Sequence, residues 1–200
     1  MNKIEELLFN INLPKRRAYR GVLLVAEPFL RESYFNHAVI CLFDYCKGKT
    51  SMGLVMNKST VYNLSDLVSS VTRKEPVPVY CGGPVSCDRL YFLHTLGDII
   101  PDATPIGNGL YIGGRFKDII DYVNADYPVE GNVRFYLGYS GWDIGQLDNE
   151  LLENVWAVAP IVDAGQLLLG GDDGYWHDQV RSMGYNYRGW LYHPQNPRLN

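Results

Sequence analysis

The stretch FYLGYSGWDIGQLDNELLENVW, residues 135–156, decides how the fold of the whole chain is interpreted. The apolar run at 132–139 predicts a strand, a Gly-Tyr-Ser-Gly turn follows it, and an amphipathic helix is predicted after the turn. Many hydrolases carry a nucleophilic serine at a sharp turn between a strand and a helix. Ser140 is therefore a candidate nucleophile, and the alternative is that the stretch is a structural joint.

The residue two positions after Ser140 argues against the nucleophile. A nucleophile elbow has the pattern G-x-S-x-G, because a side chain at the last position would clash with the tight turn. Trp142 occupies that position here. Asp163 or Asp172 and a later histidine could complete a triad, but with 22 acidic residues and 4 histidines such combinations arise easily. The sequence favours a structural joint and predicts no catalytic residue.

The helix that follows carries its own start and stop signals. Asp143 precedes Gln146 by three residues, which resembles a capping box in which the glutamine reaches back to the backbone. Asn154 can adopt the left-handed conformation that ends a helix, and Trp156 then begins the next strand. Trp142 is expected to cover the joint as a large apolar side chain. The stripe predicted to be buried consists of Leu147, Leu151 and Leu152.

Length and composition indicate one globular domain. The chain has 200 residues, of which 46% are hydrophobic and 20% charged. We expect an N-terminal helix and linker at 1–19 and a single domain at 20–200. No apolar run approaches the roughly 20 residues that cross a bilayer, and the first residues lack the layout of a secretory signal. The sequence therefore predicts a cytoplasmic protein without a membrane partner.

The cysteines and the glycine-rich segments predict neither a metal site nor a cofactor. Cys41 and Cys46 are five positions apart, and Cys81 and Cys87 are six apart, which misses the paired C-x-x-C spacing of zinc sites. We expect structural thiols. The segments at 113–118 and 170–174 lack the glycine spacing of nucleotide-binding loops.

The charge distribution argues against direct DNA binding. The net charge is −4, and no lysine or arginine lies between Arg134 and Arg181, an interval that holds eight acidic residues. A surface built from this interval would repel phosphate groups. The basic run at 15–17 is typical of a solvated linker.

Strand and helix signals mix without regular alternation, which predicts an α+β fold. The strand runs are nearly continuous in apolar residues, so much of the sheet should be covered on both faces. Strands are predicted at 21–28, 37–45, 52–57, 77–81, 90–94, 109–114, 132–139 and 156–162. Helices are predicted at 63–71, at 115–123 with Phe116, Ile119, Ile120 and Val123 on one face, and at 174–184.

The segment CGGPVSCD, residues 81–88, has two interpretations. Gly82 and Gly83 permit backbone angles that are closed to other residues, and Pro84 then fixes one angle. Exposed amide groups there could hold an anion or a peptide terminus. A tight structural connection is the alternative, and it is favoured for most glycine-proline turns.

Several motifs together resemble the YqgE/AlgH family of bacterial proteins. They are GVLLVAEPFL, SMGLVMNK, CGGPV, LYFLH, GYSGWDIGQLDNEL and the WHDQVRSMG helix, and they run from about Arg20 nearly to the C-terminus. The resemblance implies an α+β fold with a mixed, branching sheet that includes a small barrel-like portion, surrounded by helices. Some members of that family carry the label of transcriptional regulator.

The chain departs from the family pattern at a few positions. Ser140 stands where an alanine is common, Lys58-Ser59 replaces an arginine-proline pair, and Asp148 replaces a glutamate. The loop at 44–50 aligns poorly. The candidate binding or motif surface consists of Asn57, Gly82, Gly83, Pro84, His94, Gly138, Tyr139, Gly141, Trp142 and Gln146.

Three functions are weighed from the sequence. The leading interpretation is a non-enzymatic cytoplasmic protein that binds another protein or a small ligand, with the binding surface near Gly82-Gly83-Pro84. The alternative is a transcriptional regulator, which rests on the family label. A serine hydrolase that uses Ser140 comes third.

Overall fold

The structure of the chain is a computed structural model, and it describes residues 17–172 and 174–192. The helix expected at the N-terminus lies almost entirely outside the described residues. Ten strands are present in the described part of the chain: β1 (Val22–Ala26), β2 (Val39–Tyr45), β3 (Ser51–Val55), β4 (Ser59–Asn63), β5 (Pro78–Cys81), β6 (Val85–His94), β7 (Thr104–Gly107), β8 (Leu110–Ile112), β9 (Val133–Trp142) and β10 (Trp156–Pro160).

The strands form a mixed sheet that branches at β9. The main path is β10-β1-β2-β3-β9-β6-β8-β7, and all its neighbours are antiparallel. The first half of β9 pairs with β5 in parallel on one side and with β6 on the other. Its last residues, Ser140 to Trp142, pair instead with β3. This confirms the α+β class and the branching sheet.

The sheet curls until β7, at one end of the path, approaches the start of β1, the strand next to the other end. Gly21, immediately before β1, packs so closely on β7 that an added Cβ would lie 2.2 Å from the carbonyl oxygen of Ile106. The Asn108 side chain, in the turn after β7, donates a hydrogen bond to the Gly21 carbonyl. The curled part therefore encloses a core as a half-barrel does, which confirms the expected barrel-like portion.

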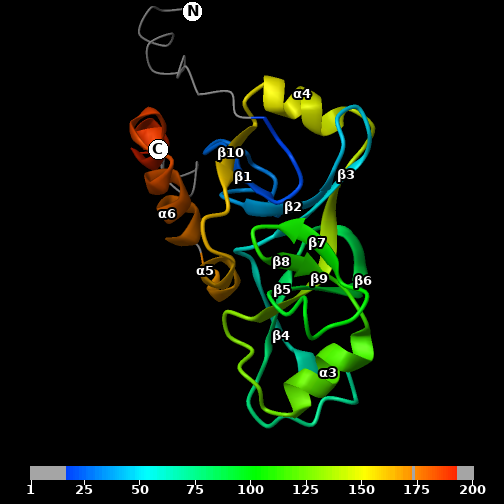
Figure 1. Cartoon of the computed structure of the whole chain (residues 1–200). Coiled ribbons are helices and arrows are strands. Elements are labelled where there is room, and N and C mark those ends of the chain that lie inside the picture. Colours follow the sequence, from blue (N-terminus) through cyan, green and yellow to red (C-terminus); the bar gives the residue numbers. More distant parts are fainter. Residues whose placement is uncertain (1–16, 173, 193–200) are drawn as a thin grey trace, which may run out of the picture.

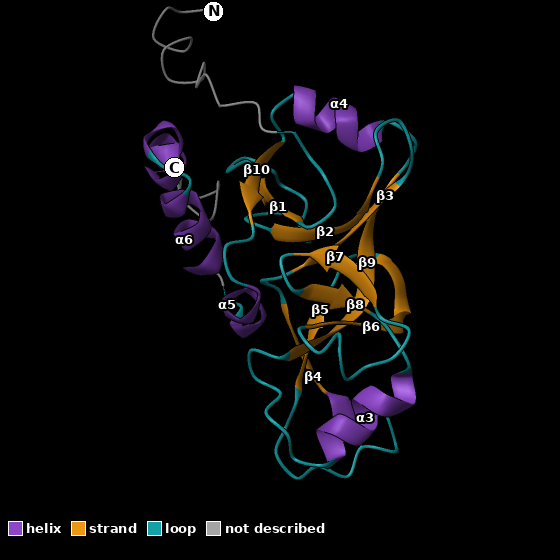
Figure 2. Cartoon of the chain, in the orientation of Figure 1, coloured by secondary structure: helices purple, strands orange, loops and turns teal. Residues whose placement is uncertain are grey.

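Helices lie around the sheet (Figure 1). Figure 2 shows α3 and α4 at opposite ends of the molecule, while α5 and α6 lie along one side. The helices are α2 (Leu64–Leu67), α3 (Phe116–Asn124), α4 (Gln146–Leu152), α5 (Ala164–Leu169), α6 (Gly174–Ser182) and the 3-10 helix η1 (Tyr185–Tyr192). None of the helices in the described ranges is long and apolar enough to cross a membrane.

The central strands are covered on both faces, as their continuous apolar sequences predict. In β1, Leu23 and Val25 face one apolar cluster, and Val22 and Leu24 face another. The first cluster includes Trp176 of α6, whose indole N–H donates to the Ala26 carbonyl. A third cluster packs α3 against β5, β6 and β9.

Several local expectations were wrong. β4 and β7 were not predicted, because one is polar and exposed and the other contains proline and glycine. The helix expected at 63–71 ends at Leu67. α5 and η1 were also missed. On two helices the predicted buried stripe is too wide, since Phe116 is 41% exposed and Leu152 is 66% exposed.

Candidate functional site

The two glycine motifs singled out from the sequence meet at the branch of the sheet. A Cβ added to Gly82 would lie 2.2 Å from the carbonyl oxygen of Gly138. A Cβ added to Gly138 would lie 2.5 Å from the carbonyl oxygen of Gly83. The Gly82 amide donates to the Leu137 carbonyl of β9, and the Gly82 carbonyl accepts from the amide of Val55, the last residue of β3. Only glycine allows backbones to approach this closely. The glycines thus join three strands.

The expected turn at GYSG does not exist, because β9 runs without interruption to Trp142. Gly138 has φ +66°, which redirects the strand toward β3 without ending it. Ser140 is fully buried, and its hydroxyl donates to the Gly82 carbonyl oxygen at 3.1 Å. The serine is therefore engaged in the joint itself and does not stand on an exposed elbow.

Replacing Ser140 by alanine should cost about 1 kcal/mol of unfolding free energy, the net value of one hydrogen bond. Alanine fits the same space, so the fold should persist. Denaturant unfolding measures the change. Covalent labelling of Ser140 in the folded protein by a fluorophosphonate probe would contradict the buried position.

Trp142 covers the joint and is held by a carboxylate that sequence reasoning missed. Its indole N–H donates to Glu150 Oε2 at 2.8 Å, and the indole of Trp156 donates to the same oxygen at 2.7 Å. The Gln146 side chain donates to the other carboxylate oxygen at 2.7 Å. The predicted apolar cover is confirmed, since Trp142 is buried.

The start of α4 follows only half of the expected capping box. The Gln146 side chain does accept a hydrogen bond from the Asp143 amide. The N-cap residue, however, is Gly145 at φ +73°, with no side-chain cap. The expected ending is confirmed by Asn154 at φ +60°. Asp143 lies two positions before Gly145, which is too early in the chain for it to act as the cap.

Asn57 and His94 are buried structural residues. The Asn57 side chain accepts from the Val39 amide and donates to the His37 carbonyl, which fixes the start of β2. His94 Nδ1 accepts from the Leu96 amide, so the ring proton is on Nε2 and points to the Gly113 carbonyl oxygen at 2.9 Å. Both side chains therefore satisfy backbone groups.

His94 makes stability depend on pH. Burial lowers the pKa of His94, and the hydrogen bond to Gly113 opposes this only in part. The unfolded chain then binds more protons, so stability is complete above about pH 6.5 and falls as the pH drops through the folded pKa. Urea unfolding between pH 7 and 5 should show this slope, and His94→Gln should flatten it. An unchanged slope in the variant would contradict the assignment.

The ten sequence-predicted residues do not converge on one cavity. They divide among the glycine joint, the Trp142 cover and the buried Asn57 and His94 positions. Pro84, Gly141 and Gln146 are exposed. The proposal that the surface near Pro84 binds a partner stays a prediction.

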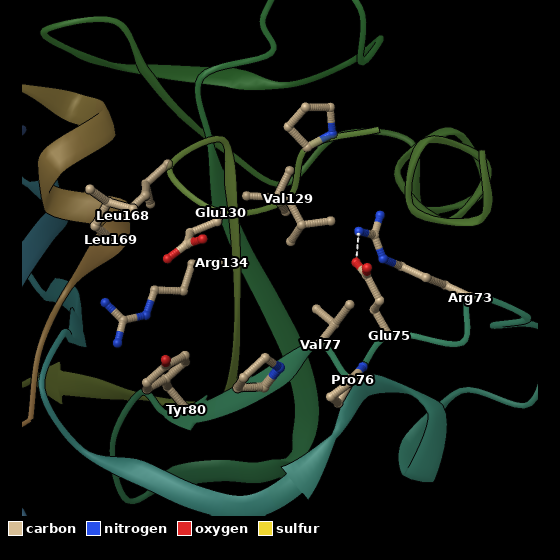
Figure 3. Close-up of a pocket in the computed structure, with 13 residues that line it drawn as sticks. Arg73, Glu75, Pro76, Val77, Tyr80, Val129, Glu130, Arg134, Leu168 and Leu169 are labelled. Carbon is tan, nitrogen blue, oxygen red and sulfur yellow. Dashed lines mark hydrogen bonds and ion pairs between the residues drawn. The ribbon is translucent and has the colours of Figure 1, made fainter. Parts of the chain in front are cut away.

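A cavity of about 440 Å³ lies elsewhere, between α5, β5 and the start of β9 (Figure 3). Arg134 of β9 lines it and is only 3% exposed. The guanidinium carbon lies 3.5 Å from the centroid of the Tyr80 ring, a cation–π contact. Gly170, after α5, leaves room for the arginine, because an added Cβ would lie 1.1 Å from Nη1.

The Arg134 guanidinium lacks the oxygen partners that a buried charge normally has. Within residues 17–172 and 174–192, none of its three nitrogens donates a hydrogen bond. Arg73, which lines the opposite side, contrasts with it. Arg73 pairs with Glu75 at 2.7 Å and donates to the Tyr127 carbonyl at 2.8 Å. The pocket thus holds one arginine with oxygen acceptors and one without any.

Comparison with known proteins decides the family. A family model described as AlgH-like matches residues 23–188, which is more than half of the chain. The chain belongs to the AlgH-like family. This confirms the resemblance seen in the sequence motifs.

Relatives of this AlgH-like chain include two UPF0301 proteins. One, from Parabacteroides distasonis, is 41% identical over 182 residues, covering 90% of this chain and 91% of the relative. Another, from Bacteroides thetaiotaomicron, is 38% identical over 197 residues, covering 98% of this chain and 99% of the relative. Neither name states an activity.

Two solved structures share the fold of this AlgH-like chain. The crystal structure of protein DIP2367 from Corynebacterium diphtheriae has a TM-score of 0.70 at 19% identity, covering 94% of this chain and 97% of that one. The solution structure of AlgH from Pseudomonas aeruginosa has a TM-score of 0.66 at 24% identity, covering 90% of this chain and 98% of that one.

Sequence reasoning missed Arg134 although a signal was present. It is the only charged residue in the apolar strand run at 132–139. A charge in a strand covered on both faces needs a partner. The elements that surround it, β5 and α5, come from distant parts of the chain, and α5 was not predicted.

Proposed function

We propose that this chain is a binding protein that takes up a small anionic ligand in the pocket beside Arg134. The observation that carries the proposal is a buried guanidinium with no hydrogen-bond acceptor in the described part of the chain. Arginine stays protonated at any physiological pH, so it cannot relieve its burial by losing its charge. An anion in the pocket would supply the missing partner.

The energetics support a ligand. Leaving a buried charge without a partner costs several kcal/mol, and proteins retain such groups mainly where they serve function. The Tyr80 ring offsets part of that cost, but a cation–π contact contributes only about 1–2 kcal/mol. A cavity of about 440 Å³ is within the range of small-molecule sites.

The lining favours binding over covalent catalysis. It consists of arginine, glutamate, tyrosine, proline, valine and leucine side chains, without a serine, cysteine or histidine. Glutamate and tyrosine can also serve as acids, bases or nucleophiles. Here Glu75 pairs with Arg73, and Tyr80 lies against Arg134. The cytoplasm is part of the same proposal, because all four cysteines are free thiols, which suits a reducing compartment.

Arg134→Met tests the proposal. The variant should lose anion binding, and in the absence of ligand it should be as stable as the parent or more stable, because a costly buried charge is removed. Hexanoate and inorganic phosphate serve as probes, in calorimetric titration and thermal unfolding of the full chain. A ligand at 100 times its Kd should stabilise the parent by about 2.7 kcal/mol.

Arg73→Met is the matched control from the same pocket. Arg73 is already paired with Glu75, so the change should lower stability, while the loss of binding should be much smaller than in Arg134→Met. The proposal fails if neither probe stabilises the parent protein. It also fails if the stabilisation survives in Arg134→Met.

A further inference from the structure

We infer that the ligand of the Arg134 pocket is a monocarboxylate with an apolar body, an inference that rests on the proposed function. Three features of the pocket specify this class: a buried guanidinium without a hydrogen-bond partner, the surrounding negative charge and the apolar lining. Each restricts a different part of the ligand.

The orientation of Arg134 selects a planar anion. The guanidinium carbon lies 3.5 Å from the centroid of the Tyr80 ring, and Gly170 packs against Nη1, so a ligand would approach along the edge formed by Nε and Nη2. A carboxylate accepts two parallel hydrogen bonds from such an edge. The head group of the ligand is therefore placed beside Arg134, at the α5 side of the pocket, where Figure 3 shows the side chain.

The charge around this guanidinium favours a ligand with a single negative charge. Arg73 is neutralised by Glu75, and Glu130 adds a further carboxylate to the lining. Leu168 and Leu169 bring the C-terminal end of α5 to the same wall, where helix carbonyls carry partial negative charge. A phosphate monoester, with a charge of about −1.5 to −2 at pH 7, would meet one cation and several negative groups.

The rest of the lining selects an apolar body. Eight of the thirteen lining residues are proline, valine or leucine. They include Val77 and Val129 on the side away from α5, and Leu168 and Leu169 on the α5 side. An aliphatic or aromatic chain extending from the carboxylate would displace water from these side chains, and each buried CH₂ should tighten binding roughly fourfold.

The test compares ligands of equal length by calorimetric titration of the full chain at pH 7. Hexanoate ends in a methyl group, 6-aminohexanoate in an ammonium group and adipate in a second carboxylate, while hexyl phosphate changes the head group. Hexanoate should bind roughly tenfold more tightly than each of the others and more tightly than acetate. Arg134→Lys keeps the positive charge but loses the two parallel N–H donors of the guanidinium, so it should weaken hexanoate binding about tenfold.

Glu130→Gln provides the matched control, because this exposed side chain can change without disturbing the core. It should improve adipate binding relative to hexanoate. If hexyl phosphate, adipate or 6-aminohexanoate binds best and depends on Arg134, the ligand class is wrong while the binding function stands. If no anion binds, both proposals fail.

Discussion

Gly138→Ala should unfold the protein or lower its free energy of unfolding by at least ~4 kcal/mol. An added Cβ at this position would lie 2.5 Å from the Gly83 carbonyl oxygen and 2.8 Å from that of Val85. Both neighbours are backbone atoms of the branch, so neither can move without separating strands. A loss of ~4 kcal/mol corresponds to a fall in Tm of about 8–16 °C in a chain of this size.

Gly145→Ala separates the effect of the close approach from that of the backbone angle. Gly145 also has positive φ, at +73°, but no atom lies within 4 Å of an added Cβ. This variant should lose only the strain of a left-handed residue, about 1 kcal/mol. Thermal unfolding of both variants decides the matter, and equal losses would show that the branch does not depend on close backbone contact.

Trp142→Ala should lower the free energy of unfolding by about 3–5 kcal/mol, the usual cost of truncating a buried tryptophan. The side chain is 5% exposed, packs edge-on against Trp156 and donates to Glu150. Alanine would leave a cavity between α4 and the sheet. Denaturant unfolding gives the magnitude.

Trp142→Phe serves as the control, because it keeps an aromatic ring but removes the N–H that reaches Glu150. Glu150 would still accept from Trp156 and Gln146, so the loss should be about 1–3 kcal/mol. An unaltered unfolding midpoint in Trp142→Ala would mean that the tryptophan does not support the joint.

The parts of the fold that could be predicted are those with a local pattern. β1 and β10 are short apolar runs between turn residues, and α6 has an apolar stripe with a terminal glycine. β4 lacks that signal, because its sequence STVYN is polar and it is held by pairing with β5 alone. The continuation of β9 past Gly138 depends on a third strand, β3, which no local pattern reveals.

The candidate site was less predictable than the fold. The motifs with distinctive residues, such as Gly82 and Gly138, proved to be places where strands cross, because close backbone contact demands glycine. Glu150 could not be found, since its role depends on two indoles that meet only in the folded protein. Arg134 gave one signal, its charge in an apolar strand, but its lack of a partner is a property of the packed structure.

The most direct test of the anion site is a crystal structure of the full chain with hexanoate at neutral pH. We predict a carboxylate in the plane of the Arg134 guanidinium, with both oxygens about 2.7–2.9 Å from its nitrogens and the Tyr80 ring still stacked beneath. The chain of the ligand should extend toward Val77 and Val129. A structure in which Arg134 donates to protein oxygens and hexanoate is absent from the pocket would contradict the account.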